Sequence, residues 1–285
     1  MTTEKPLFAG PKVLLMGASG SGKTYSLGTL VDWAAAQTPA REVFVLFTEN
    51  GLETLLGYWR DRGKPIPANL HWHVHKTPAL SLESLLEGAK KVGLMNYESL
   101  TKTTDPNRGT NNPWEKLLQV FTNFPDDRTG EKFGNIGTWG PDRILVNDSL
   151  TETANACFKM VTGNKPVAAQ NEYMVAQNNL INWVRFMTQT LQCTFVMTAH
   201  VHKVVNEVSG SMQLMVKTGI GKALSDDMPQ MFSEALYCAR NGTEWFWETA
   251  AANVDTKTRY LPIASKIKPD FAQIMDKWLA RAKEE

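Results

Sequence analysis

Two patterns of apolar and polar residues alternate along this chain of 285 residues. Short, unbroken apolar runs are typical of strands that are buried on both faces of a sheet. Between these runs, apolar residues recur at every third or fourth position, which is typical of amphipathic helices. Strands that alternate with helices indicate an α/β fold in which helices flank a mostly parallel sheet. The clearest apolar runs are residues 13–16, 43–47, 144–146 and 193–198, and the first helical pattern covers 27–34.

The end of the chain shows a different pattern. Two extended segments, 235–240 and 245–247, flank the pair Asn241-Gly242. Asn-Gly favours the tight turn that joins two antiparallel strands, so a C-terminal β-hairpin is expected. A last helical pattern follows residue 269. We therefore predict that residues 1–285 form a single domain.

Two long segments interrupt the alternation. Residues 95–142 are rich in turn-forming residues around one short helical pattern at 114–121. We interpret this segment as an excursion from the sheet, and a contact surface for a partner is an equal alternative. Residues 201–227 have no sustained period and directly follow a predicted strand. Long loops in such places are usually functional, so a mobile loop is predicted there.

Composition, cysteine content and net charge indicate the general class of this protein. Apolar residues make up 42% of the chain and charged residues 21%, which is ordinary for a globular domain. The sequence has neither an export signal nor an apolar stretch long enough to span a membrane. Cys157, Cys193 and Cys238 are isolated from one another, as reduced thiols of a cytosolic protein are. We expect a cytoplasmic protein, and its net charge of +1 does not by itself indicate nucleic acid.

The first apolar run leads into a glycine-rich segment that matches the phosphate-binding loop, G-x-x-x-x-G-K-[ST], at every fixed position. Backbone N–H groups of such a loop bind an anion together with the positive end of the next helix. Lys23 is expected to reach the β- and γ-phosphates, and the Thr24 hydroxyl is expected to bind Mg²⁺. The sequence thus predicts a site for a nucleoside triphosphate. The loop consists of Gly17, Ala18, Ser19, Gly20, Ser21, Gly22, Lys23 and Thr24.

Acidic residues follow two other predicted strands. Asp148 suits the Walker B position, where a carboxylate beside the phosphate loop holds Mg²⁺ through water. The next residue is Ser149, whereas many ring ATPases have there the glutamate that orients the attacking water. Glu49 is therefore predicted to be the catalytic carboxylate, with Glu53 in reserve. The alternative for Glu49 is a charge or cap at a helix N-terminus.

His200 stands at the tip of the strand predicted at 193–198. A polar side chain in this position would lie next to the γ-phosphate and could sense it. A purely structural hydrogen bond is an equal alternative for this residue.

Three further histidines, His71, His73 and His75, alternate along a predicted strand at 70–75. Residues two apart on a strand are spaced by about 7 Å, which is too far to share one metal ion without other ligands. A solvated or edge face of the sheet is therefore the preferred interpretation.

Together these residues resemble the RecA-like ATPase core, the fold shared by RecA recombinases and KaiC, over residues 11–269. Asp148-Ser149 looks like the recombinase Walker B element, and 47–53 looks like the strand end that carries their catalytic glutamate. His200 stands where they have the glutamine that couples nucleotide state to DNA. More closely, the chain is similar to phage-encoded RecA-core proteins, short ATPases implicated in single-strand annealing and recombination. This similarity rests on the phosphate loop and on segments 147–150, 198–200 and 221–224.

The resemblance implies ATP and Mg²⁺ as cofactors, single-stranded DNA as a partner, and a homo-oligomeric ring or filament. It also suggests a single-strand binding protein as a partner, and a host cytoplasm as the location if the gene is phage-borne. In such assemblies a cation of the neighbouring subunit completes the nucleotide site. Lys266 and Lys268 resemble the paired lysines of recombinases, and Arg259 is a rival arginine finger. Ordinary solvated charges are the alternative for all three.

Three functions fit this sequence. The first is an ATPase that acts on single-stranded DNA in recombination or annealing, with Glu49 orienting the water. The second is a P-loop small-molecule or nucleoside kinase, which predicts a lid with several arginines that the sequence does not show. The third is a nucleotide-dependent scaffold in which ATP only controls assembly. GTP is disfavoured, because the segment 164–167 lacks the Asp that reads guanine.

Overall fold

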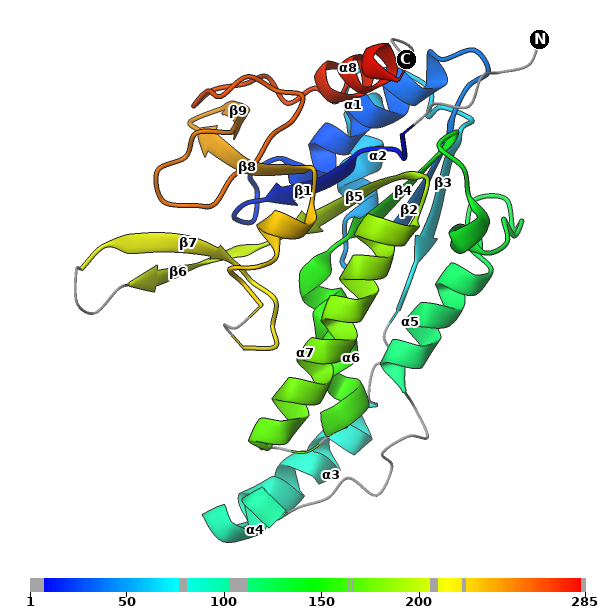
Figure 1. Ribbon diagram of the computed structural model, residues 1–285. Coiled ribbons are helices and arrows are strands. Elements are labelled where there is room, and N and C mark those ends of the chain that lie inside the picture. Colours follow the sequence, from blue (N-terminus) through cyan, green and yellow to red (C-terminus); the bar gives the residue numbers. More distant parts are fainter. Residues whose placement is uncertain are drawn as a thin grey trace.

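A seven-stranded sheet runs through the middle of the molecule, as the computed structural model shows (Figure 1). All neighbouring strands pair in parallel except the last two, which form an antiparallel hairpin at one edge. In spatial order the strands are β3 (Leu70–Val74), β2 (Glu42–Phe47), β4 (Arg143–Asp148), β5 (Thr194–Ala199), β1 (Lys12–Met16), β8 (Glu234–Asn241) and β9 (Glu244–Glu248). The structure describes residues 8–76, 81–102, 112–163, 165, 167–205, 210–221 and 224–282.

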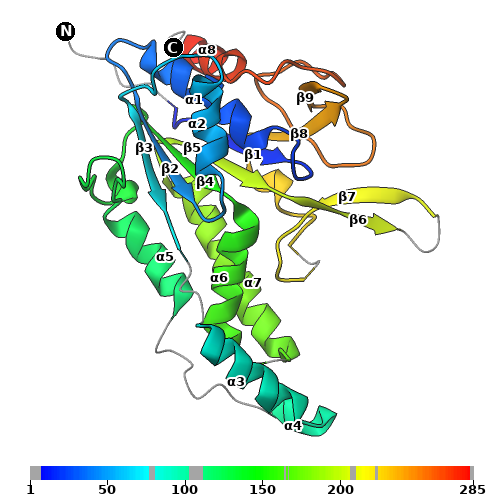
Figure 2. The ribbon, with the colours of Figure 1, turned by 180° about the vertical axis from the view of Figure 1, so that it is seen from behind.

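Helices cover both faces of this sheet (Figure 2). One face packs against α1 (Lys23–Ala35), α2 (Leu52–Arg60) and α8 (Ala272–Arg281). The other packs against α5 (Pro113–Thr122), α6 (Leu150–Thr162) and α7 (Gln170–Arg185). The predicted α/β class, with a mostly parallel sheet flanked by helices and a C-terminal hairpin, is confirmed. A π-helical turn, Phe186–Thr190, follows α7, and 3-10 turns lie at Ile136–Thr138 and Pro229–Met231.

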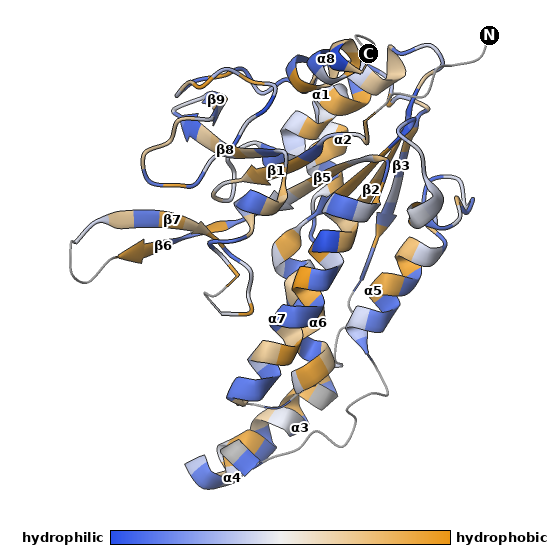
Figure 3. Cartoon of the chain, in the orientation of Figure 1, coloured by the Kyte–Doolittle hydropathy of each residue, from blue (hydrophilic) through white to orange (hydrophobic). Residues whose placement is uncertain are grey.

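The unbroken apolar runs explain why the sheet lies between two helical layers. Successive side chains of a strand point to opposite faces, so a run with no polar residue needs apolar partners on both. In β1, Val13 and Leu15 pack into the core beneath α1 and α2, whereas Leu14 and Met16 pack into the core on the other face. Figure 3 shows the apolar strands between helices whose outer surfaces are more polar.

The segment predicted as an excursion divides into two parts. Residues 112–142 belong to the core, since Trp114, Phe121, Phe124 and Trp139 are at most 5% exposed. Asn112 begins α5 by accepting hydrogen bonds from the N–H groups of Trp114 and Glu115, as helix-capping residues do. Aromatic side chains therefore bury a turn-rich stretch that looked like surface, although these residues contribute no strand to the main sheet. Earlier in the segment, α4 (Tyr97–Lys102) extends beyond the helical layer together with α3 (Leu82–Gly93), which precedes the segment (Figure 1).

The segment 201–227 also differs from the predicted loop. It contains an antiparallel hairpin of β6 (Val201–Val205) and β7 (Met212–Val216), a two-stranded sheet separate from the main one. Each strand is only five residues long, and several of their side chains are exposed, so no clear apolar alternation marks them in the sequence. Residues 206–209 and 222–223 of this segment lie outside the described residues.

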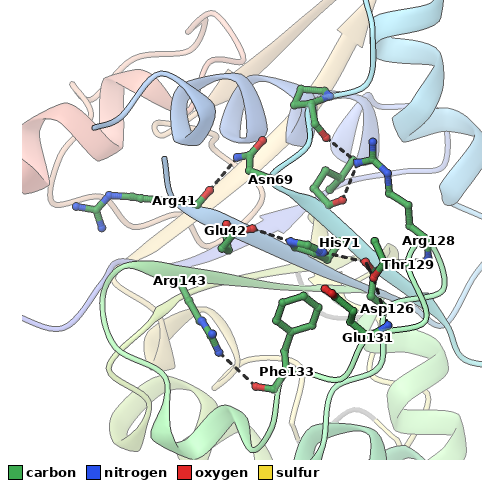
Figure 4. A network of polar contacts seen from close by, with 12 residues as sticks. Arg41, Glu42, Asn69, His71, Asp126, Arg128, Thr129, Glu131, Phe133 and Arg143 are labelled. Atoms are coloured by element: carbon green, nitrogen blue, oxygen red, sulfur yellow. Dashed lines mark hydrogen bonds and ion pairs between the residues drawn. The ribbon is translucent and has the colours of Figure 1, made fainter. Parts of the chain in front are cut away.

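The histidines of β3 do not all face solvent (Figure 4). His71 is only 8% exposed, and its ring lies between two carboxylates, with Nε2 2.6 Å from Glu42 and Nδ1 2.9 Å from Asp126. His73 pairs with Asp127 at 2.8 Å. The predicted edge position is confirmed, because β3 is an outer strand of the sheet, but His71 is not solvated, because the turn that carries Asp126 folds over it. Among the described residues, no cluster of histidine, cysteine and acidic side chains could hold a metal ion.

No helix in the described part of the chain has the length and apolarity that crossing a bilayer requires.

Candidate nucleotide-binding site

Four neighbouring parallel strands end at the same edge of the sheet, and each delivers one predicted functional segment there. The register places Met16 beside Ala199 and Phe47 beside Asp148. The phosphate loop therefore follows β1, Glu49 follows β2, Asp148 ends β4, and His200 follows β5. Ligands of open α/β sheets bind outside the carboxyl ends of the strands, so this edge is the expected position of a site. The predicted residues lie together; their catalytic roles stay predictions.

The phosphate loop has the backbone that its glycines allow. Gly20 and Gly22 adopt left-handed conformations, with φ of 73° and 83°. A Cβ on Gly22 would come within 2.9 Å of the Trp245 ring, and one on Gly17 would come within 2.5 Å of the Cys238 carbonyl oxygen. The Ser21 hydroxyl is buried in this loop without a hydrogen-bond partner among the described residues. An orphaned buried hydroxyl inside a glycine-rich turn fits a loop built to hold an anion.

Lys23 begins α1 and turns back over the loop. Its Nζ donates hydrogen bonds of 2.9 Å to the carbonyl oxygens of Gly17 and Ala18. Burial lowers the pKa of its ammonium group. A cation held over the loop mouth is in position to bind phosphate oxygens.

Asp148 and Thr24 form the part of the site that suits a divalent cation. Thr24 Oγ1 donates to Asp148 Oδ2 at 2.9 Å, and the hydroxyl of Thr198 donates to the other carboxylate oxygen. Burial raises the pKa of the Asp148 carboxyl, and these two hydrogen bonds act in the opposite direction. A nearby cation would favour the ionised carboxylate, and hydroxyl and carboxylate oxygens are the ligands that Mg²⁺ prefers. The residues present therefore fit Mg²⁺.

Glu49 stands across from this pair and is only partly exposed. Its Oε2 lies 3.1 Å from Nε2 of His200, and its Oε1 accepts a hydrogen bond from the Ser149 hydroxyl. The hydrogen bond from His200 lowers the pKa of the Glu49 carboxyl, and burial opposes that effect. Glu53, the reserve, is exposed in the first turn of α2. Glu49 does not cap that helix, because the N-cap is Gly51 and no side chain caps it.

A cavity of about 520 Å³ adjoins the phosphate loop. It lies between α1, α2 and the segment before α8, and the rings of Tyr25, Tyr58 and Trp245 line it. Trp245 Nε1 also donates a hydrogen bond of 3.2 Å to the carbonyl oxygen of Gly20. Trp245 was not among the predicted site residues. The only available signal was the hairpin itself, whose place beside β1 a sequence pattern does not reveal.

The three cations predicted to act on a neighbouring subunit occupy different places. Lys266 is exposed and pairs with Glu244 at 2.6 Å, whereas Lys268 lines the cavity and lies 3.4 Å from Asp270. Arg259 is exposed, and its backbone N–H donates to the carboxylate of Glu234. Because Glu234 pairs with Val13 at the start of β1, that carboxylate lies at the end of the sheet opposite the phosphate loop.

Comparisons with known proteins give likenesses to solved structures but none to a family model or a curated sequence. No protein-family model matches the sequence, and no curated protein sequence matches it. Among solved structures, an ATPase of the type III secretion system of pathogenic bacteria is similar, with 14% identity and a TM-score of 0.41. The likeness covers 81% of this chain and 53% of that one, so this chain spans about half the length of that ATPase. A likeness this distant does not show what the site does, so the reaction that the site supports follows from the geometry of this chain alone.

Proposed function

We propose that this chain is a Mg²⁺-dependent ATPase whose turnover responds to single-stranded DNA. The observation that supports hydrolysis is the meeting of Lys23, Thr24, Asp148 and Glu49 at the ends of three parallel strands and their loops. A lysine on a phosphate loop, two oxygen ligands for a metal and a separate carboxylate are the parts that phosphoryl transfer to water requires.

Each residue has a distinct task in this proposal. Lys23 binds the phosphate oxygens, and Thr24 and Asp148 hold the cation. Bound Mg²⁺ would neutralise charge on the phosphates. Glu49 orients the attacking water and accepts its proton.

The cavity beside the loop fits the base of the nucleotide. Tyr25 and Trp245 lie with their ring centroids 6.0 Å apart, next to Gly22 of the loop. Aromatic rings that line a pocket offer flat apolar surface, against which a base can stack. This arrangement favours a nucleotide as the ligand over a simple phosphate ion.

The DNA part of the proposal rests on the resemblance and on the position of the β6–β7 hairpin. β6 starts at Val201, directly after His200, so this hairpin is covalently continuous with the residue that touches Glu49. The same resemblance supports a homo-oligomer in which Lys266, Lys268 or Arg259 acts on a neighbour, and action in phage-type recombination or annealing.

The experiment measures ATP hydrolysis by the purified chain with and without single-stranded DNA. We expect DNA to stimulate turnover, and Glu49→Gln to lower the rate by about a hundredfold or more while ATP still binds. Glu53→Gln is the matched control, because Glu53 is exposed one turn away and should keep the wild-type rate.

Other outcomes would favour the alternatives. Phosphate transfer to a small molecule in preference to water would support the kinase. Tight ATP binding that changes the assembly state without turnover would support the scaffold. Turnover that DNA does not change would remove single-stranded DNA from the proposal.

A further inference from the structure

The carboxylate of Glu49 is engaged on both of its oxygens. Oε1 accepts a hydrogen bond from the Ser149 hydroxyl, and Oε2 faces Nε2 of His200 at 3.1 Å. Because an ionised carboxylate only accepts hydrogen bonds, Nε2 of His200 carries the proton of the second contact. Both contacts stabilise the ionised form and lower the pKa of Glu49, which makes the carboxylate a weaker base toward water.

The contact between Glu49 and Ser149 is fixed by the main sheet. Ser149 is 1% exposed, and its N–H donates to the Thr48 hydroxyl at 2.8 Å, while that hydroxyl lies 3.0 Å from the carbonyl oxygen of Ser149. The Thr48 N–H donates to the carbonyl oxygen of Asp148 at 2.7 Å. These bonds join the ends of β2 and β4, so Ser149 keeps its position as long as the main sheet is intact.

The contact between Glu49 and His200 depends on the β6–β7 hairpin, which is hydrogen-bonded to the backbone of His200. The carbonyl oxygen of His200 accepts a hydrogen bond of 2.8 Å from the N–H of Lys217, the residue that follows β7. Val201 and Val216, the neighbours of these two residues, form the first pair of the hairpin. The carbonyl oxygen of Lys217 in turn accepts a hydrogen bond from Thr151 on α6 at 3.2 Å. A shift of this hairpin therefore acts directly on the backbone of His200.

We propose that Ser149 and His200 form a clamp that holds Glu49 in a resting position, and that movement of the β6–β7 hairpin withdraws His200 and releases the carboxylate. Ser149 and His200 are then positioning residues, and the contact is autoinhibitory. This inference rests on the proposed function, because it assigns to Glu49 the water-orienting role. It adds a reason for low turnover at rest and a route by which a ligand on the hairpin raises it.

The test compares variants that open either side of the clamp. Ser149→Ala removes one donor, and His200→Leu removes the other. A hydrogen bond to a charged group stabilises the clamped position of Glu49. Losing either bond should therefore raise ATP turnover without DNA by about tenfold. Stimulation by DNA should shrink by a similar factor, because the carboxylate is already free. His200→Gln keeps an N–H donor, so its basal rate should lie well below that of His200→Leu.

Two control variants replace a bonded histidine and a bonded serine away from the site. His73→Leu breaks the pair with Asp127 on β3, and Ser233→Ala removes a hydroxyl that bonds the backbone of Lys12. Both should keep the wild-type basal rate. Basal turnover of Ser149→Ala and His200→Leu at or below the wild-type level would overturn the clamp.

A second readout does not depend on turnover. Crystal structures of the wild type and of the two variants, without nucleotide, would show where the Glu49 carboxylate lies. The clamp predicts that the carboxylate keeps both contacts in the wild type and leaves this position in His200→Leu and in Ser149→Ala. A carboxylate that stays in place in both variants would overturn the clamp even in an active ATPase. A displaced carboxylate in a chain that never hydrolyses ATP would support the clamp contacts and remove the proposed function instead.

Discussion

Gly51 lies so close to Asp148 that a Cβ at this position would come within 2.4 Å of the carboxylate oxygen Oδ2. Atoms of the Phe47 ring would lie 2.9 Å from the same Cβ, so the new methyl group would come too close to both residues. We therefore expect Gly51→Ala to displace Asp148 and to lower Mg²⁺-dependent ATP turnover by about a hundredfold. Steady-state kinetics over a range of Mg²⁺ concentrations would measure this effect.

The matched control is Gly57→Ala on the same helix. A Cβ at Gly57 would meet only Asp61 Oδ2, at 3.8 Å, which is an ordinary contact. Alanine is the better helix former by about 0.8 kcal/mol, so this variant should be as active as the wild type and slightly more stable. Equal losses of activity in both variants would contradict the role given to Gly51.

Trp245 is expected to determine nucleotide affinity more than turnover. Trp245→Ala removes one wall of the cavity and the hydrogen bond to Gly20. Loss of an aromatic contact should weaken ATP binding by about tenfold, with little change in the rate at saturation. Calorimetric titration with a non-hydrolysable ATP analogue would measure the affinity. Phe246→Ala, the next residue on β9, is the control, because adjacent strand residues point to opposite faces.

Asp126 should stabilise the edge of the sheet in a pH-dependent way. Burial acts to raise the pKa of its carboxyl, but hydrogen bonds from His71, Thr129 and backbone N–H groups hold the pKa below its usual value. Because the folded pKa is lower than the unfolded one, this stabilisation is present above the unfolded pKa and is lost as the pH falls through the folded pKa.

Asp126→Asn should therefore lower the free energy of unfolding by about 2 kcal/mol at pH 7. The difference from the wild type should shrink as the pH falls below about 4. Urea unfolding at several pH values would show this. Asp127→Asn is the control, because its side chain is 41% exposed and its loss should change stability by less than about 1 kcal/mol.

The three thiols are expected to be unreactive in the folded chain. Cys157, Cys193 and Cys238 are all buried, and burial raises the pKa of Cys238 to about 12. Since the thiolate is the reactive form, a thiol reagent at pH 8 should label none of them in native protein and all of them in urea. Rapid labelling of the native chain would show that one of these residues becomes accessible.

Local patterns were enough to predict the phosphate loop, the central strands and the meeting of Asp148, Glu49 and His200. The reason is physical: an unbroken apolar run requires a buried strand, and parallel strands bring their carboxyl ends to one edge. Once the strands are identified, the residues that follow them are placed near one another.

Long-range packing accounts for what the patterns missed. Trp245 reaches the loop only because β8 pairs with β1, and His71 is buried only because the turn at Asp126 folds over β3. The β6–β7 hairpin escaped notice because its apolar residues keep no sustained period, and of them only Val216 is fully buried. Each of these contacts joins segments whose own sequences carry no sign of the partner.

The pairing of β1 with β8 also sets the order in which this protein can mature. The backbone of Lys12 bonds Ser233, which lies 221 positions later in the chain. A ribosome makes the phosphate loop before it makes Asp148, His200 and Trp245. A nascent chain therefore carries the loop long before it has the walls of the site. The site is complete only after β9 has emerged, so a nascent chain that stops before Trp245 lacks one wall of the cavity beside the loop.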